Sequence, residues 1–271
     1  MMMAREIPFF KMEASGNDFV VVDNRKKLIS DAASFAKDAC QRHTGIGGDG
    51  LLLMESSKKA DFKMRILNAD GSEAEACGNG FRCIALLAHR KLNFGREHRF
   101  ESLGGRIDAF VTGGRVRVRL MDPKDFLERQ KIKLGEKELT YCFIRVGVPH
   151  VVIFVEGLSQ LPVFELGRAI RYHSQFKPAG TNVNFVEVTG PHSICIETYE
   201  RGVEENTEAC GTGSTASALV SALAGYVEPP VEVKTRGGEI LTVDFLKKGN
   251  RIQDVYLEGE AKLVYEGKIS I

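Results

Sequence analysis

The chain has 271 residues, enough for two domains of ordinary size. Hydrophobic residues make up 43% and charged residues 27%, as in globular proteins, and a formal net charge of +1 gives no electrostatic reason to expect nucleic acid or a membrane as partner. Glu6 and Pro8 stand where a signal peptide needs an apolar stretch, and apolar runs such as 151–155 are too short to span a bilayer. We therefore expect a cytoplasmic protein.

The first half of the chain alternates strand-like and helical runs. The predicted strands are 19–23, 51–55 and 62–67, and the predicted helices are 31–41 and 81–89. Ser30 is a residue type that caps helices, and it precedes the first of them. Alternating residues on both sides of Gly113-Gly114 predict a hairpin.

The second half of the chain opens with a polar, lysine-rich stretch, 122–138, which is the best candidate for a linker. A second hairpin-like region contains Gly237-Gly238. The predicted strands are 143–148, 151–155, 184–188 and 194–199, and the predicted helices are 161–171 and 214–224. Both halves therefore read as β-rich, each with one long helix.

One short phrase occurs twice. The segments Ser72–Gly80 and Glu205–Gly213 share the pattern Glu-Ala-Cys-Gly-x-Gly, with Cys77 and Cys210 at the same place. Each copy follows a strand-like run and precedes a helical run, so the repeat predicts a duplicated half-molecule with one thiol from each half. The other cysteines lie in apolar segments without zinc-like spacing and are expected in the core: Cys40, Cys83, Cys142 and Cys195.

The repeated motif suits acid/base chemistry at a carbon atom. A cysteine at the start of a helix feels the partial positive charge of the unpaired amides, which lowers the thiol pKa. The adjacent Gly-x-Gly leaves backbone amides open to a ligand carboxylate. Two such helix ends could hold one carboxylate and place a sulfur on each face of its α-carbon, one as base and one as acid. The competing interpretation is a pair of structural cysteines at glycine-rich helix starts.

Several further motifs resemble those of the diaminopimelate epimerase family, from Phe10 to Ile271. They are Lys11-Met-Glu-Ala-Ser-Gly-Asn-Asp-Phe19, Gly45-Ile-Gly-Gly-Asp49, Asn68-Ala-Asp-Gly-Ser-Glu73, Cys77-Gly-Asn-Gly80, Pro149-His150, Asn182, Glu200-Arg-Gly202 and Cys210-Gly-Thr-Gly213. The resemblance implies an α/β (α+β) fold of two similar domains, each a long central helix wrapped by a curved, mostly antiparallel sheet, with the active site in the cleft between them. The implied domains are 1–120, joined by a C-terminal strand at about 258–271, and 121–257.

The resemblance also implies an activity. This is the cofactor-independent epimerisation of LL-2,6-diaminoheptanedioate to the meso isomer, in lysine and peptidoglycan precursor biosynthesis, by a homodimer without metal. Carried over residue by residue, Cys77 and Cys210 are the acid/base pair, and His150 and Glu200 tune the thiols. The implied substrate-binding residues are Asn17, Asn68, Gly78, Asn79, Asn182, Glu200, Arg201, Gly211 and Thr212.

Three departures from the family pattern bear on substrate choice. Val148 stands where many members have asparagine, Ala14 replaces a common glycine, and the loop 203–207 is one residue longer than usual. A racemase for another amino acid, such as histidine, is therefore one alternative. Proline racemases and hydroxyproline dehydratases share the fold but resemble different cysteine motifs. A reversible disulfide between Cys77 and Cys210, acting as a redox switch, is an alternative of another class.

Overall fold

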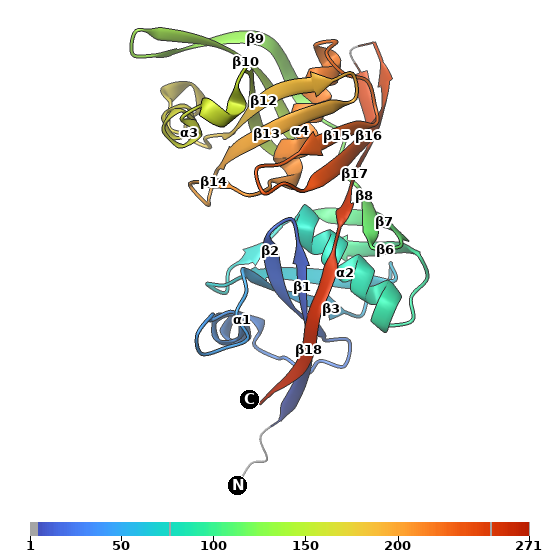
Figure 1. Ribbon diagram of the computed structural model, residues 1–271. Coiled ribbons are helices and arrows are strands. Elements are labelled where there is room, and N and C mark those ends of the chain that lie inside the picture. The colour runs from blue at the N-terminus through green and yellow to red at the C-terminus, as the bar shows by residue number, and fades with distance from the viewer. Residues whose placement is uncertain (1–4, 76, 250, 271) are drawn as a thin grey trace. The chain divides into compact units, whose positions relative to one another are not determined.

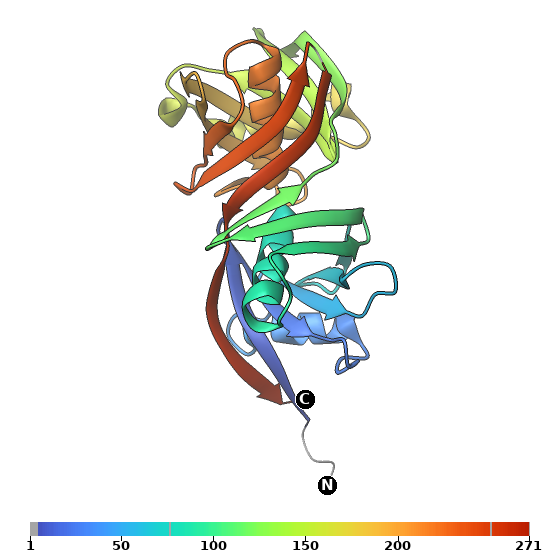
Figure 2. The ribbon, with the colours of Figure 1, turned by 90° about the vertical axis from the view of Figure 1, so that its right-hand side faces the viewer.

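The structure is a computed structural model that describes residues 5–75, 77–249 and 251–270 (Figures 1 and 2). Ala76 of the first motif copy lies outside the described residues, as do residues 1–4 and Ile271 at the ends of the predicted N-terminal domain. The chain forms two compact units. Unit 1 contains Met1–Val118 and Gly259–Ile271, and unit 2 contains Arg119–Glu258.

Unit 1 is built on one sheet with two helices. Its strands are β1 (Glu6–Ala14), β2 (Asn17–Asp23), β3 (Gly50–Glu55), β4 (Phe62–Asn68), β5 (Glu73–Ala74), β6 (Glu97–Ser102), β7 (Gly105–Thr112), β8 (Arg115–Arg119) and β18 (Lys262–Ser270). Its helices are α1 (Ala32–Ala39) and α2 (Gly78–Lys91). The strands pair in the order β18-β1-β2-β3-β4-β6-β7-β8, with β5 beside β4. Only β2–β3 and β4–β6 among these pairs are parallel.

Unit 2 is built in the same way. Its strands are β9 (Lys124–Leu134), β10 (Lys137–Val146), β11 (Val148–Phe154), β12 (Asn182–Gly190), β13 (Ser193–Glu200), β14 (Glu205–Thr207), β15 (Val231–Lys234), β16 (Ile240–Lys248) and β17 (Arg251–Glu260). Its helices are α3 (Val163–Arg171) and α4 (Gly211–Leu223), with short 3₁₀ turns at Leu158–Gln160 and Ser174–Phe176. The strands pair in the order β9-β10-β11-β12-β13-β15-β16-β17, with β14 beside β13.

The two units repeat one topology. In each unit, a short helix connects two neighbouring parallel strands. Helix α1 connects β2 to β3, and α3 connects β11 to β12. In each, a small hairpin strand, β5 or β14, precedes the cysteine and the long helix, α2 or α4. The outermost strand differs in origin, because β9 directly precedes its neighbour β10 whereas β18 comes from the far end of the chain to pair with β1. The predicted mixed α/β fold with an internal duplication is confirmed.

The central strands of unit 1 are buried on both faces. Val20, Val22, Leu51 and Leu53 pack in one cluster with residues of α1. The alternate side chains point to the opposite face, where α2 contacts β2 and β3, and Leu52 there is 0% exposed. Two covered faces explain why these strands read as continuous apolar runs in the sequence. Figure 2 shows α2 beside β7, and Figure 1 shows α4 among the strands of unit 2.

Two sequence-based predictions are wrong. The predicted linker at 122–138 is instead occupied by β9 and the start of β10, which form a hairpin. Most of β9 is exposed on both faces, and Ile132 is its only buried residue, so the strand lacks the apolar alternation that reveals strands. The first helix begins at Ala32, and its cap is Asp31, whose side chain accepts a hydrogen bond from the Ser34 amide, rather than Ser30.

Candidate active site

The two repeated cysteines occupy equivalent positions within their units. Each is the N-cap residue of a long helix, Cys77 of α2 and Cys210 of α4, in extended backbone conformation. Each sulfur accepts a hydrogen bond from the amide three residues on. The distances are 3.5 Å from Gly80 N to Cys77 Sγ and 3.4 Å from Gly213 N to Cys210 Sγ. Sulfur thus takes the place of the oxygen that usually caps a helix.

Packing requires the second glycine of the Cys210 motif and leaves little space at that of the Cys77 motif. A Cβ atom on Gly213 would lie 2.5 Å from Asn184 Oδ1, and one on Gly80 would lie 3.1 Å from Met64 Cε. These glycines bring the helix start close against the sheet. The amides at Gly78, Asn79, Gly211 and Thr212 belong to the first turns of α2 and α4, where the helix offers no partner of its own. Their binding of a substrate carboxylate stays a prediction.

Unit 1 brings two of the predicted polar residues together. Asn79 in the first turn of α2 donates from Nδ2 to Oδ1 of Asn17, the first residue of β2, at 2.7 Å. Asn68, the last residue of β4, donates from Nδ2 to Ser72 Oγ at 2.9 Å within a turn. Asn17 and Asn79 therefore form a joined pair near the helix start, whereas Asn68 is held separately.

Unit 2 places a carboxylate against its cysteine. Glu200 at the end of β13 hydrogen-bonds the Cys210 thiol and also accepts from Thr207 Oγ1 at 3.2 Å. Cys210 Sγ lies 3.5 Å from Thr212 Oγ1. Burial raises the pKa of Cys210 well above its usual value, and the Glu200 charge raises it further. The prediction that the helix start lowers the thiol pKa is therefore wrong for Cys210, because desolvation and the carboxylate outweigh the amides.

Burial also raises the pKa of Glu200, although the hydrogen bonds from Thr207 and Cys210 act in the opposite direction. Cys210 is 5% exposed. The raised pKa keeps Cys210 a neutral thiol, hydrogen-bonded to the half-buried Glu200 side chain.

His150 lies at the buried centre of unit 2. It is 0% exposed on β11, and its Nδ1 lies 3.3 Å from Asn184 Nδ2. Burial, together with the nearby positive charge of Arg201, lowers the pKa of His150 to about 3. The imidazole is therefore neutral at ordinary pH. Among the described residues, none hydrogen-bonds its Nε2.

A hydrogen bond joins the backbone of Arg201 to the side chain of Asn182. The Arg201 amide donates to Asn182 Oδ1 at 2.7 Å, and one guanidinium nitrogen of Arg201 donates to the Ala179 carbonyl at 3.0 Å. Unit 2 thus gathers Asn182, Glu200 and Arg201 at the neighbouring ends of β12 and β13.

One buried polar residue was not found from the sequence. Asn184 on β12 is 0% exposed and donates to the Val151 carbonyl at 2.8 Å. Its Oδ1 accepts from Thr198 Oγ1 at 3.0 Å, and it also contacts His150. Asn184 therefore holds His150 in place. An asparagine inside an apolar strand was the available signal, since such a group needs partners when it is buried.

The described residues contain no metal site and no membrane span. Within them, no three His, Cys, Asp or Glu side chains are grouped so that they could hold a metal ion. No helix in the same ranges is long and apolar enough to cross a bilayer.

Solved structures of other proteins share the fold of this chain. The crystal structure of a phenazine biosynthesis protein of the PhzF family from Bacillus anthracis matches with a TM-score of 0.75 at 16% identity, over 98% of this chain and 100% of that chain. This likeness shows the fold alone, a duplicated mixed α/β architecture.

The sequence comparisons then give the family. A family model described as diaminopimelate epimerase matches residues 9–123 and 142–264. The diaminopimelate epimerase of Aquifex aeolicus is 43% identical, with 97% of each chain covered. That of Chlorobaculum tepidum is 42% identical over 96% of this chain and 100% of its own. The chain belongs to the diaminopimelate epimerase family, and the predicted resemblance is confirmed.

Proposed function

We propose that this protein is an isomerase that inverts one α-carbon of LL-2,6-diaminoheptanedioate to give the meso isomer, in lysine and peptidoglycan precursor biosynthesis. Family membership over nearly the whole chain supports this proposal. The observation that carries the chemistry is the equivalent placement of Cys77 and Cys210 as N-caps of the two long helices.

The proposed reaction moves one proton off the α-carbon and one proton onto it. A cysteine thiolate removes the α-proton and becomes a thiol, while the other thiol delivers a proton to the opposite face and becomes a thiolate. The substrate carboxylate rests on the first-turn amides of Gly78, Asn79, Gly211 and Thr212, which stabilise the negative charge as the carbanion forms. The thiols and amides supply every step, so the proposal includes no cofactor.

Two further groups are assigned to tuning the thiols in this proposal. Glu200 contacts Cys210 directly and can take its proton when that residue must act as the base. His150 is assigned to tuning the thiol chemistry as a neutral, buried imidazole, since its pKa of about 3 makes it a poor proton acceptor.

The remaining polar groups are assigned to the rest of the substrate. Asn17, Asn68 and Asn182 present amides, which orient a zwitterion without adding charge. Arg201 is assigned to the distal carboxylate, which a guanidinium can bind with two parallel hydrogen bonds.

The decisive test is incubation of the reduced protein with LL-diaminopimelate in D₂O, followed by chiral separation and mass analysis. Conversion to the meso isomer with one deuterium per turnover is expected. Cys77→Ala and Cys210→Ala should each lower the rate of α-proton exchange by about a hundredfold or more. Cys195→Ala, which changes a half-buried cysteine of β13, is the matched control.

A fully active double variant of Cys77 and Cys210 would overturn the mechanism. Absence of conversion by wild-type protein with reactive thiols would overturn the substrate instead. A panel of other L-amino acids, histidine among them, would then be assayed, with Val148 at the start of β11 as the first position to examine.

We further propose that the enzyme is a cytoplasmic homodimer. The support is the family resemblance and the place of the reaction in precursor biosynthesis. Sedimentation equilibrium of the purified protein tests the dimer, and fractionation of cells tests the location. A monomer at working concentration, or recovery outside the cytoplasm, would contradict these assignments.

A further inference from the structure

A chain of hydrogen bonds runs through both asparagines of unit 1. Arg82 on α2 donates to Asn79 Oδ1 at 2.7 Å, and Asn79 Nδ2 donates to Asn17 Oδ1 at 2.7 Å. Asn17 Nδ2 then donates to Asp49 Oδ2 at 3.1 Å. These hydrogen bonds therefore join the first turn of α2 to the loop before β3. Asn79 is 5% exposed and Arg82 is 0% exposed, so the Arg82 end of this hydrogen-bond series is shielded from water.

The two ends of this hydrogen-bond series differ in whether they donate or accept. A guanidinium can only donate hydrogen bonds, and an ionised carboxylate can only accept them. The two amides between them can each do both, and a half-turn about the last side-chain bond exchanges oxygen for nitrogen. With Arg82 at one end and Asp49 at the other, only one orientation of Asn79 and Asn17 avoids a donor facing a donor. The ends thus fix which way both amides point.

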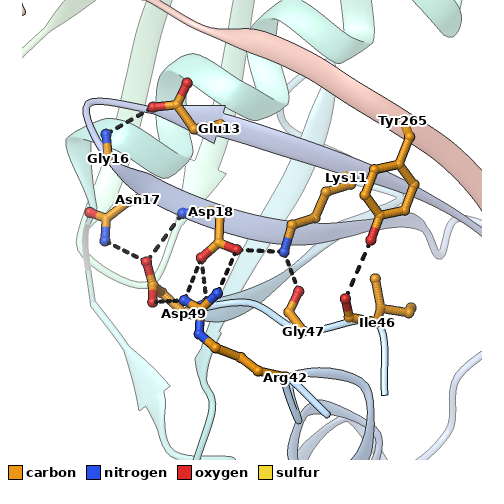
Figure 3. A network of polar contacts seen from close by, with 10 residues as sticks. All are labelled: Lys11, Glu13, Gly16, Asn17, Asp18, Arg42, Ile46, Gly47, Asp49 and Tyr265. Carbon is orange, nitrogen blue, oxygen red and sulfur yellow. Dashed lines mark hydrogen bonds and ion pairs between the residues drawn. The ribbon is translucent and has the colours of Figure 1, made fainter. Parts of the chain in front are cut away.

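Asp49 is itself held firmly, as Figure 3 shows. Its Oδ1 accepts from Arg42 at 2.7 Å, and its Oδ2 accepts from the Asp18 amide at 3.2 Å as well as from Asn17. Arg42 also binds both carboxylate oxygens of Asp18, at 2.8 and 3.1 Å.

Lys11 completes the cluster from the buried side. Its Nζ lies 2.6 Å from Asp18 Oδ2 and also donates to the Gly47 carbonyl. Although burial opposes ionisation of Asp18, the hydrogen bonds from Arg42 and Lys11 keep the pKa of that carboxyl well below its usual value. Asp18 therefore keeps its charge, and the Asp18 amide that Asp49 accepts from stays in a fixed place.

We propose that Asp49 is a positioning residue that sets the orientation of the Asn17 side chain, in register with Asn79, which Arg82 holds from the other side. This inference rests on the proposed function, in which Asn17 contacts the substrate. Asp49 acts only through Asn17. Its acceptor-only character makes Asn17 present a fixed arrangement of one oxygen and one NH₂ group to its surroundings.

The competing explanation is that Asp49 serves only as the ion-pair partner of Arg42. The structure offers a matched control, because Arg42→Ala removes that ion pair, and the bonds to Asp18 too, while leaving the Asp49–Asn17 hydrogen bond intact. Asp49→Ala removes both. An exposed ion pair contributes little to stability, so neither variant is expected to unfold.

The kinetic arm compares these two variants with wild type. For Asp49→Ala we expect KM to rise about tenfold with kcat little changed, since loss of an oriented binding contact weakens substrate binding. Arg42→Ala should stay within about threefold of wild type. Asp49→Asn should also stay within about threefold, because its one oxygen can face Asn17 while Arg42 keeps Asp18.

The second arm needs no activity. The side-chain amide signals of Asn17 and Asn79 in the ¹⁵N–¹H NMR spectrum should both move in Asp49→Ala and stay near their wild-type positions in Arg42→Ala. Equal effects of the two substitutions on KM or on these signals would overturn the proposal, as would a fall in kcat at unchanged KM. If wild type fails to convert diaminopimelate, the proposed function fails, and the NMR comparison still decides the role of Asp49.

Discussion

The Cys210 thiol is hydrogen-bonded to the Glu200 carboxylate, and burial raises the pKa of both groups. Two acidic groups therefore share one enclosed space, where an additional negative charge is costly. A proton can pass directly between them. Burial is the larger cause of the raised pKa of Cys210, and the charge of Glu200 raises it further.

Replacing Glu200 with glutamine should make Cys210 easier to ionise. The carboxylate charge raises the thiol pKa, so Glu200→Gln is expected to lower it. The same change removes the proposed proton acceptor, and kcat is expected to fall about a hundredfold. Thiolate ultraviolet absorbance against pH, with Cys210→Ala subtracted, measures the pKa. Glu232→Gln, an exposed change on β15, is the control, and an unchanged Cys210 titration in Glu200→Gln would refute the argument.

His150 should make folding stability depend on pH. Burial lowers its pKa from 6.5 to about 3, so between these values the unfolded chain binds a proton that the folded chain does not. The contribution of His150 to the free energy of unfolding is therefore present above about pH 6.5 and is lost as the pH falls towards 3. His150→Gln should flatten this slope.

Urea unfolding at several pH values measures that slope. The exposed His43→Gln variant is the control for loss of a histidine that is not enclosed. The same slope in His150→Gln and in wild type would show that the buried imidazole does not titrate as described.

Gly213 should not tolerate even a methyl group. A Cβ there would lie 2.5 Å from Asn184 Oδ1 and 3.1 Å from Thr198 Oγ1, and Asn184 in turn holds His150. Gly213→Ala is expected to lower the free energy of unfolding by about 1–3 kcal/mol, as overpacked cores do. Thermal unfolding tests this, with Gly95→Ala as the control, because nothing lies within 4 Å of a Cβ at Gly95. Equal stability of the two variants would contradict the packing role.

Glu204 should hold the loop that carries Arg201. Its Oε1 accepts from the Gly202 amide at 3.0 Å and from Arg171 at 3.0 Å, and its own φ of 62° is unusual for a residue other than glycine. Glu204→Gln should weaken these bonds, lower the free energy of unfolding by about 1–3 kcal/mol and raise KM. Urea unfolding and steady-state kinetics measure both effects. The exposed Glu205→Gln should change neither, and a matching loss there would point to general loop damage.

The local features of the candidate site could be predicted from the sequence. The strand, loop and helix around each cysteine follow from short-range patterns, because apolar periodicity and glycine punctuation act over a few residues. The helices at Cys77 and Cys210 begin at the motif, and the Gly113-Gly114 turn joins β7 to β8. The reason for the second glycine in each motif became clear only when Asn184 and Met64 were seen against it.

Properties that depend on enclosure could not be predicted in this way. A helix start alone favours the thiolate, yet Cys210 stays a thiol because the surrounding core removes it from water and the Glu200 charge opposes its ionisation. The strand β9 was hidden because its exposed faces show no apolar alternation, and only its pairing with β10 defines it.

The sequence by itself determined the duplicated cysteine motif and the family, and it predicted the two-thiol chemistry, since each depends on which residues stand next to one another. Only the tertiary structure decided that Asp49 meets Asn17, that β18 completes the sheet beside β1, and that burial reverses the expected pKa shift of Cys210. These features join residues far apart in the chain, and their energies come from desolvation and long-range pairing, which no local pattern encodes.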